Sequence, residues 1–214
     1  MEQFVINIGR QLGSGGRTVG EIIARRLGVK LYDKELINLA ARESGICPEF
    51  FEKADEKESR GVISTVVGYL RAPFVGDDGG VTNVLSNDAL FKIQSDVIRA
   101  VAARESAVFV GRCADYILRD DPDCLSFFIH NNMENRIQRI LESQNITVEQ
   151  AKELMGKTDK SRAAYYNYYT NKEWGVASSY NFSIDVSVLG VDETVEFMKA
   201  FVERKMNKRP PHFG

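Results

Sequence analysis

The sequence predicts an α/β protein of three layers, in which helices cover both faces of a parallel sheet. Three observations predict it. Five short segments are almost continuously apolar, longer segments with helical periodicity separate them, and a glycine-rich loop follows the first apolar segment. Strands that are apolar throughout and alternate with helices pair in parallel, with both sheet faces buried.

The order of these elements follows from the periodicity. The expected strands are Phe4 to Ile8, Val29 to Tyr32, Ala107 to Val110, Cys124 to Ile129 and Phe182 to Val186. The expected helices are Thr18 to Leu27, Lys34 to Glu43, Asn87 to Glu105, Met133 to Gln144, Val148 to Tyr169 and Asp192 to Lys205. Gly28 and Gly45 stand where a glycine ends the first two helices.

At 214 residues the chain is expected to form one domain over residues 1–206. Residues 56–86 contain five glycines and break every sustained period, which predicts an exposed, mobile insertion. Residues 207–214 include Arg209-Pro210-Pro211, which predicts a short disordered tail.

Composition excludes several classes of function. Lys and Arg total 28 against 30 Asp and Glu, so no overall charge favours nucleic acid or an anionic membrane. The start, MEQFVINIGR, lacks the basic and apolar parts of a signal peptide, and no apolar run reaches membrane-spanning length. Neither close pairs nor metal-ligand spacings occur among Cys47, Cys113, Cys124, His130 and His212. We therefore expect reduced, mostly buried thiols in a cytoplasmic protein.

The glycine-rich loop after the first strand, from Gly9 to Thr18, predicts an anion site. Glycines let backbone amides turn toward a phosphate, and the helix that follows adds unpaired amides and a favourable dipole. Arg17 adds a mobile cation, and the hydroxyl of Thr18 suits Mg²⁺.

Three interpretations of this loop remain open at this point. The first is a phosphate-binding loop that departs from the Walker pattern. With Gly15 as the last glycine of that pattern, Gly16 takes the place of the lysine and Arg17 comes one residue late. Gly13 and Gly15 also satisfy the first two positions of a dinucleotide-binding fingerprint, with Asp33 ending the second strand. The third interpretation is a turn that only connects strand and helix.

Further candidate residues follow later strands. Asp33 is either a ligand or the cap of the next helix. Arg112 directly follows the third strand and is either an anion ligand at the carboxyl edge of the sheet or a surface salt-bridge partner. The remaining charged groups are site residues or ordinary solvated helix faces: Arg136 with Arg139, and Asp159 with Lys160 and Arg162.

Together these segments resemble the cytidylate kinase-like family over nearly the whole chain. The matching stretches are GRQLGSGGRTVGEIIARRLGVKLYDKELI, FVGRCADYIL, FFIHNNMENRIQRI, TDKSRAAYYNYYTNKEWG and YNFSIDVSVLGVDETVEFM. The resemblance implies a P-loop NTPase fold with a parallel five-stranded sheet of order 2-3-1-4-5. It also implies an acceptor-binding insertion at about 34–86 and a lid at about 155–179.

The resemblance implies site roles as well. Those for the donor phosphates are Gly13, Ser14, Gly15, Gly16, Arg17 and Thr18. Arg112 would contact the acceptor phosphate, Asp159 and Arg162 would face the acceptor sugar and the transferring phosphate, and Arg136 would lie against the donor base. The sequence departs from the family at the loop lysine, at Leu39, at Met155 and at Cys113, which replaces an acidic residue. Asp115 and Lys157 are the candidate compensations for these changes.

The function that the sequence predicts is transfer of a phosphoryl group from ATP, with Mg²⁺, to a nucleoside monophosphate such as CMP or dCMP. Arg17, Arg112 and Arg162 would close around the phosphates. A same-fold kinase of another small acceptor and a non-catalytic nucleotide-binding regulator are the alternatives. The tyrosines from Tyr165 to Tyr169 suit helix packing better than base stacking, because the chain carries no basic groove pattern.

Overall fold

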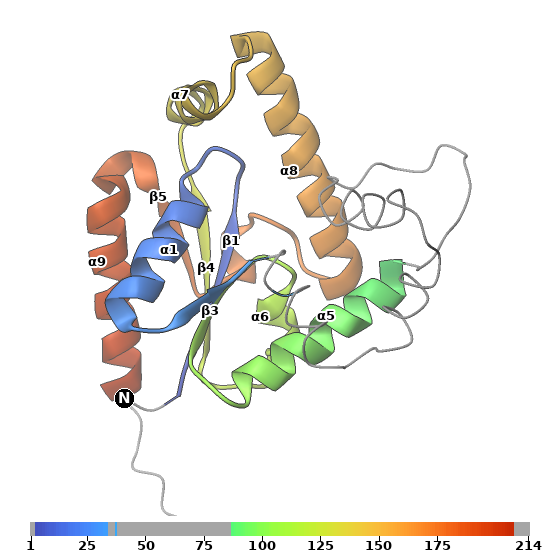
Figure 1. Ribbon diagram of the computed structural model, residues 1–214, viewed down its shortest axis with the longest axis vertical. Coiled ribbons are helices and arrows are strands. Elements are labelled where there is room, and N and C mark those ends of the chain that lie inside the picture. The colour runs from blue at the N-terminus through green and yellow to red at the C-terminus, as the bar shows by residue number, and fades with distance from the viewer. Residues whose placement is uncertain (1–2, 34–36, 38–86, 208–214) are drawn as a thin grey trace, which may run out of the picture.

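The computed structural model describes residues 3–33, 37 and 87–207. Its centre is a parallel sheet of five strands in the order β2-β3-β1-β4-β5 (Figure 1). The strands are β1 (Val5–Arg10), β2 (Lys30–Tyr32), β3 (Ala107–Val110), β4 (Cys124–His130) and β5 (Phe182–Asp185). The predicted set of strands and their order 2-3-1-4-5 are confirmed.

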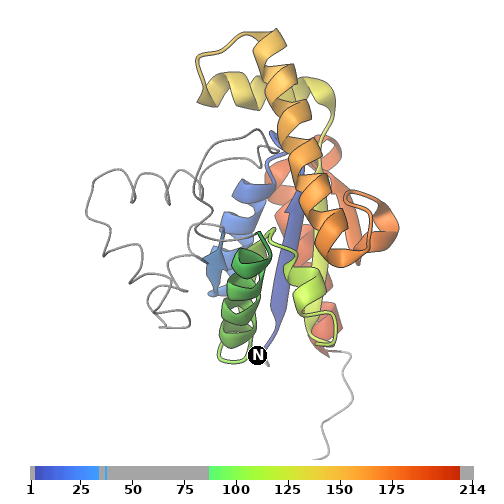
Figure 2. The ribbon, with the colours of Figure 1, turned by 90° about the vertical axis from the view of Figure 1, so that its right-hand side faces the viewer.

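Helices cover both faces of this sheet (Figures 1 and 2). One face packs against α1 (Gly16–Leu27) and α9 (Val186–Asn207), and the other against α5 (Asn87–Ala102) and α6 (Ala114–Ile117). Alternate residues of β1 divide between the two cores, because successive strand side chains point to opposite faces. Ile6 and Ile8 join the core under α1 and α9, while Val5 joins the core under α5.

A pair of helices extends beyond the carboxyl end of the sheet (Figure 1). These are α7 (Met133–Ser143) and α8 (Val148–Thr170), which pack through a small apolar cluster that includes Ile140 and Met155. A reciprocal capping box of Thr147 and Gln150 starts α8. The far end of α8 returns to α5, where the ring of Tyr169 stacks on that of Phe91 at 4.0 Å. A short 3₁₀ turn (Ala177–Ser179) then leads into β5.

Several boundaries differ from the sequence-based expectation. β1 continues through Gly9 and Arg10 because the partner strand β4 supplies ladder positions up to Ile129. Helix α1 begins at Gly16, two residues early. The four-residue α6 was not expected, since one turn is too short to show a period. The last helix begins at Val186 and kinks at Gly190 (φ 74°, ψ 177°), which hid its first turns from a periodic pattern.

Other predictions fall outside the described residues: the insertion at about 34–86 and the helix from Lys34 to Glu43, each except Ile37, the tail at 208–214, and Cys47. Of the thiols that the structure describes, Cys113 is buried and Cys124 is half-buried, and neither is in a disulfide. Burial raises the pKa of both thiols, that of Cys124 to about 12, so both stay protonated at neutral pH. Within the described ranges, no helix has the length and apolarity needed to cross a bilayer.

Candidate active site

The glycine loop is a short turn between β1 and α1, and its shape is fixed by two glycines and by hydrogen bonds of Ser14. Gly13 (φ 76°) and Gly15 (φ 85°) both adopt the left-handed conformation that side chains disfavour. A Cβ at Gly13 would stand 2.6 Å from the backbone oxygen of Arg136. The hydroxyl of Ser14 donates to the Gln11 carbonyl at 2.9 Å and accepts from the Gly16 amide at 3.2 Å. Each of these contacts holds the loop in one shape.

The amino end of α1 is suited to an anion. Its N-cap, Gly15, contributes no side-chain cap, and no acidic residue stands in its first turn. The first amides of a helix have no partner within the helix, and the helix dipole adds positive potential there. The loop and helix therefore have the geometry expected of the anion site that the sequence predicted.

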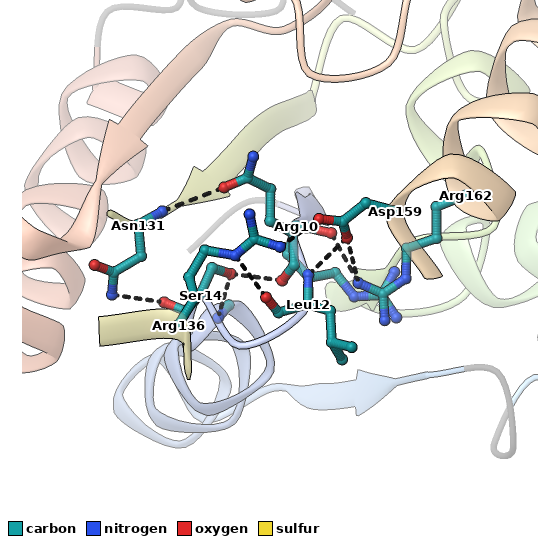
Figure 3. A network of polar contacts seen from close by, with 9 residues as sticks. Arg10, Leu12, Ser14, Asn131, Arg136, Asp159 and Arg162 are labelled. Atoms are coloured by element: carbon teal, nitrogen blue, oxygen red, sulfur yellow. Dashed lines mark hydrogen bonds and ion pairs between the residues drawn. The ribbon is translucent and has the colours of Figure 1, made fainter. Parts of the chain in front are cut away.

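Two charged residues fasten the loop to the α7–α8 pair (Figure 3). The carboxylate of Asp159 accepts from the Leu12 amide at 2.8 Å, and Nε of Arg136 donates to the Leu12 carbonyl at 2.8 Å. Arg136 and Asp159 also form an ion pair with each other, in which the side chains are only 8% and 16% exposed. This arrangement, which we call the loop pin, satisfies both backbone groups of Leu12. It brings two predicted site residues together at the loop.

A second group of arginines lies at the carboxyl edge of the sheet. Arg10 ends β1, Arg112 follows β3, and Arg162 of α8 donates from Nη1 to the Arg10 carbonyl at 3.0 Å (Figure 3). Burial, followed by the charges of Arg162 and Arg112, lowers the pKa of Arg10 to about 9. Burial also lowers the pKa of Arg162, against the attraction of Asp159 and with repulsion from Arg112. We call Arg10, Arg112 and Arg162 the arginine cluster; its mutual repulsion is what a bound polyanion relieves.

Arg112 lies in the turn after β3, where the backbone conformation is unusual. Gly111, Arg112 and Cys113 follow one another with φ of 80°, 59° and 57°. Left-handed conformations cost free energy for residues with a Cβ, and they concentrate at functional sites. The guanidinium of Arg112 lies 5.4 Å from the centre of the Tyr165 ring, a cation–π contact that orients it.

Arg17 and Thr18 occupy the exposed side of the loop. The side chain of Arg17 is 63% exposed and pairs with Glu21 at 3.1 Å and with the buried Asp33 at 2.9 Å. Asp33, predicted as a ligand or a cap, thus lies within reach of α1. Thr18 is exposed in the first turn of α1, next to the loop.

Asp115 lies in the buried layer below α8. Its carboxylate accepts a hydrogen bond from the Tyr166 hydroxyl at 2.7 Å. Burial raises the pKa of Asp115, and the Tyr166 hydroxyl lowers it again in part. The second oxygen, Oδ1, is buried without a hydrogen-bond partner in the described part of the chain. The hydrogen bond of its side chain is therefore with α8.

A pocket of about 410 Å³ opens between α7 and the start of α9. Asn131, Arg139, Ser187 and Gly190 are among its lining residues. It adjoins the glycine loop, because the amide of Asn131 contacts the Ser14 carbonyl at 3.4 Å and the guanidinium of Arg139 would meet a Cβ at Gly15 at 3.2 Å. Nothing in a linear pattern joins α7 to residue 190, so this pocket could not be predicted from the sequence.

A candidate magnesium ligand beside the loop is a single side-chain oxygen rather than a cluster of ligands. In residues 3–33, 37 and 87–207, no three His, Cys, Asp or Glu side chains form a metal cluster. Mg²⁺ is usually held by one or two protein oxygens together with water and substrate phosphates, so no such cluster is required. The hydroxyl of Thr18, exposed beside the loop, is an oxygen of this kind.

Known proteins resemble this chain in sequence and in fold. A cytidylate kinase of Methanopyrus kandleri is 24% identical over 208 residues, which cover 97% of both chains. A crystal structure of an uncharacterized protein from Eubacterium ventriosum superposes with a TM-score of 0.70 and 26% identity, over 94% of this chain and 99% of that one. A shikimate kinase of Bacteroides thetaiotaomicron shares the fold, with a TM-score of 0.52 at 13% identity, over 94% and 98% of the two chains.

The family model agrees with the motifs that carry the resemblance. This model spans the glycine loop, the loop pin, the arginine cluster and the whole sheet, and therefore most of the chain. The model of the cytidylate kinase-like family matches residues 5–188, and the chain belongs to this family of P-loop kinases.

Proposed function

We propose that this protein transfers the γ-phosphoryl group of ATP to a nucleoside monophosphate, with CMP or dCMP as the acceptor. The observation that carries the proposal is the position of the arginine cluster. It lies at the same sheet edge as the glycine loop, and the charges of its members repel one another. The acceptor is suggested by the similarity to the cytidylate kinase of Methanopyrus kandleri.

The donor side of the site runs from the pocket to the loop. The pocket beside Arg139 would take the donor nucleoside, and the amides from Gly13 to Thr18 would hold its phosphates. Mg²⁺, held in part by Thr18, would neutralise charge on the phosphates during transfer. Arg136 would lie near the donor base, and its hydrogen bond to the Leu12 carbonyl would hold the loop in position.

The acceptor side would be formed by Asp33, Arg112, Asp115, Asp159 and Arg162. Arg112 and Arg162 would bind the acceptor phosphate and the moving phosphoryl group. A phosphate oxygen of the acceptor attacks the γ-phosphorus, the bond to the bridging oxygen breaks, and ADP leaves with the electron pair. No general base is needed, because the attacking oxygen is already ionised. Closure of a lid at 155–179 around the phosphates would exclude water.

The test is ADP production by purified protein with ATP and Mg²⁺, against CMP, dCMP, UMP, AMP, GMP, shikimate and several sugars. We expect turnover with a cytidine monophosphate. Arg112→Ala should lose about 2 to 4 kcal/mol of transition-state stabilisation, as for one preorganised charged donor. Arg25→Ala, on an exposed position of α1, is the matched control.

Other outcomes of this assay have definite meanings. Turnover with a different acceptor would keep the kinase and replace its substrate. Binding of ATP without transfer to any acceptor would favour a nucleotide-binding regulator whose loop has lost its lysine. Wild-type turnover in Arg112→Ala would remove that residue from the site.

A further inference from the structure

The glycine loop lacks the lysine of the Walker pattern, and the structure shows what fills its place. With Gly15 as the last glycine of the pattern, the first glycine falls on Arg10 and the lysine on Gly16. A Cβ built on Gly16 would stand 2.5 Å from Cβ of Arg10 and 3.1 Å from its Cγ. The stem of the Arg10 side chain therefore occupies the space where a side chain at position 16 would begin.

The far end of Arg10 reaches the sheet edge where phosphate would arrive. Its Nη1 lies against Gly111, so closely that a Cβ there would collide with it. Arg10 thus extends from the amino end of α1 to the turn that carries Arg112. Gly16 and Gly111 both lack the side chain that would block this path.

The charge of Arg10 is not neutralised by an ion pair among the residues that the structure describes. The carboxylate of Asp33 raises its pKa through space, but the ion pair of Asp33 at 2.9 Å is with Arg17. With a pKa lowered to about 9, Arg10 is still a cation at neutral pH. Arg10 is half-buried, and a partly desolvated cation among like charges is destabilising by itself, whereas a bound anion would stabilise it.

We propose that Arg10 is the phosphate-binding cation of this site, with the glycine and the basic residue of the Walker pattern exchanged between positions 10 and 16. This inference rests on the proposed function and adds a catalytic residue to it. Arg10 would contact the β- and γ-phosphates of the donor from the strand side, where a P-loop lysine approaches from the helix side. Its planar fork suits two phosphate oxygens at once.

The test measures nucleotide binding without any acceptor, so it does not depend on turnover. We would titrate ATP, ADP and adenosine into wild type, Arg10→Gln, Arg10→Lys and Arg25→Gln by calorimetry. Arg10→Gln should weaken ATP and ADP binding about 10- to 100-fold, the loss of one charge-assisted contact, and leave adenosine binding unchanged. Arg10→Lys should retain part of the affinity, and Arg25→Gln all of it.

The exchange itself is tested by reversing it. Gly16→Lys alone should unfold more easily, because its side chain collides with Arg10. In Arg10→Gly/Gly16→Lys that obstacle is gone, and we expect ATP affinity within about tenfold of wild type, while Arg10→Gly alone stays weak. If Arg10→Gln does not fold, this double variant decides: recovery supports the inference, and a loss beyond about 100-fold overturns it.

The two proposals fail in different ways. Equal ATP affinity of wild type and Arg10→Gln would overturn the role of Arg10 and leave the kinase proposal intact. A wild-type protein that binds no ATP would overturn both. Equal weakening of ATP and adenosine binding in Arg10→Gln would also overturn the inference, since it would indicate structural damage to the loop.

Discussion

The glycine loop is flanked by two arginines whose surroundings are opposite: Arg136 is buried, and Arg10 is half-buried. Arg136 lies in the loop pin, where Asp159 neutralises it and the Leu12 carbonyl accepts its hydrogen bond. Arg10 lies in the arginine cluster, where, after burial, repulsion from Arg162 and Arg112 has the largest effect on its pKa. A buried charge with its own partner is explained by the fold, whereas a partly desolvated charge among like charges marks a candidate ligand site.

Arg162 belongs to both surroundings and connects them. Its Nη1 stands 3.9 Å from Asp159 and donates to the Arg10 carbonyl at 3.0 Å. A movement of α8 would therefore change contacts of the loop pin and of the arginine cluster together. Arg162 thus links α8 to the loop pin and to the end of β1.

The largest expected effect is on stability, from breaking the loop pin. Arg136→Met leaves the carboxylate of Asp159 largely buried without its main cation, and we expect the free energy of unfolding to fall by about 3 kcal/mol. Urea denaturation followed by circular dichroism measures it. Arg136→Met/Asp159→Leu should recover part of that loss, because no unpaired charge remains, although the amide and carbonyl of Leu12 lose these two partners.

Arg139→Met is the matched control for this experiment. Arg139 stands one turn further along α7 and lines the pocket. Its substitution should change the free energy of unfolding by less than about 1 kcal/mol and instead weaken binding of the donor nucleoside. If Arg139→Met lowered the free energy of unfolding as much as Arg136→Met, the two positions would not differ in their contribution to stability.

An intermediate effect on the free energy of unfolding is expected at Asp115, a buried carboxylate that accepts a hydrogen bond from a hydroxyl rather than from a cationic side chain. Tyr166→Phe removes the hydrogen bond of 2.7 Å, and at about pH 8 it should cost about 1 to 3 kcal/mol. Tyr168→Phe, at a position 70% exposed, should cost less than about 0.5 kcal/mol. Urea denaturation of the two variants under the same conditions measures both losses.

The pH dependence of this pair has a definite sign. Burial raises the pKa of Asp115, so its folded form holds a proton more tightly than the unfolded form. The contribution of Asp115 to stability is therefore fully present below its ordinary pKa and is lost as the pH rises through its raised value. The Tyr166 hydroxyl favours the ionised form, so the difference between wild type and Tyr166→Phe should shrink as the pH is lowered. A difference that grows in acid would contradict this account.

The sequence predicted the sheet, its order and the anion loop because these depend on local patterns and on a family resemblance. Continuous apolar runs indicate buried parallel strands, and glycines before a helix indicate an anion site. It misplaced the end of β1, because Gly9 and Arg10 are strand residues only through pairing with β4. That boundary concealed Arg10, which by composition alone belonged to the loop.

The rest of the site depends on contacts between distant residues. Leu12 and Asp159 meet across 147 positions, and Asn131 meets Ser14 across 117. No spacing rule relates such pairs. One signal for Arg10 was nevertheless present: a glycine at the lysine position, with an arginine where the first Walker glycine belongs.

The smallest effect should come from Arg17, the cation that the sequence first suggested for the donor phosphates. Its side chain is 63% exposed and is shared between the exposed Glu21 and the buried Asp33; the exposed pair contributes about 0 to 1 kcal/mol, and the pair with Asp33 competes with a phosphate for Arg17. Arg17 must leave Asp33 to reach a phosphate. Arg17→Ala should therefore weaken ATP binding less than about fivefold, against the roughly 10- to 100-fold expected for Arg10→Gln. The same calorimetric titration measures both, and a larger loss in Arg17→Ala would return the phosphate-binding role to the helix side of the loop.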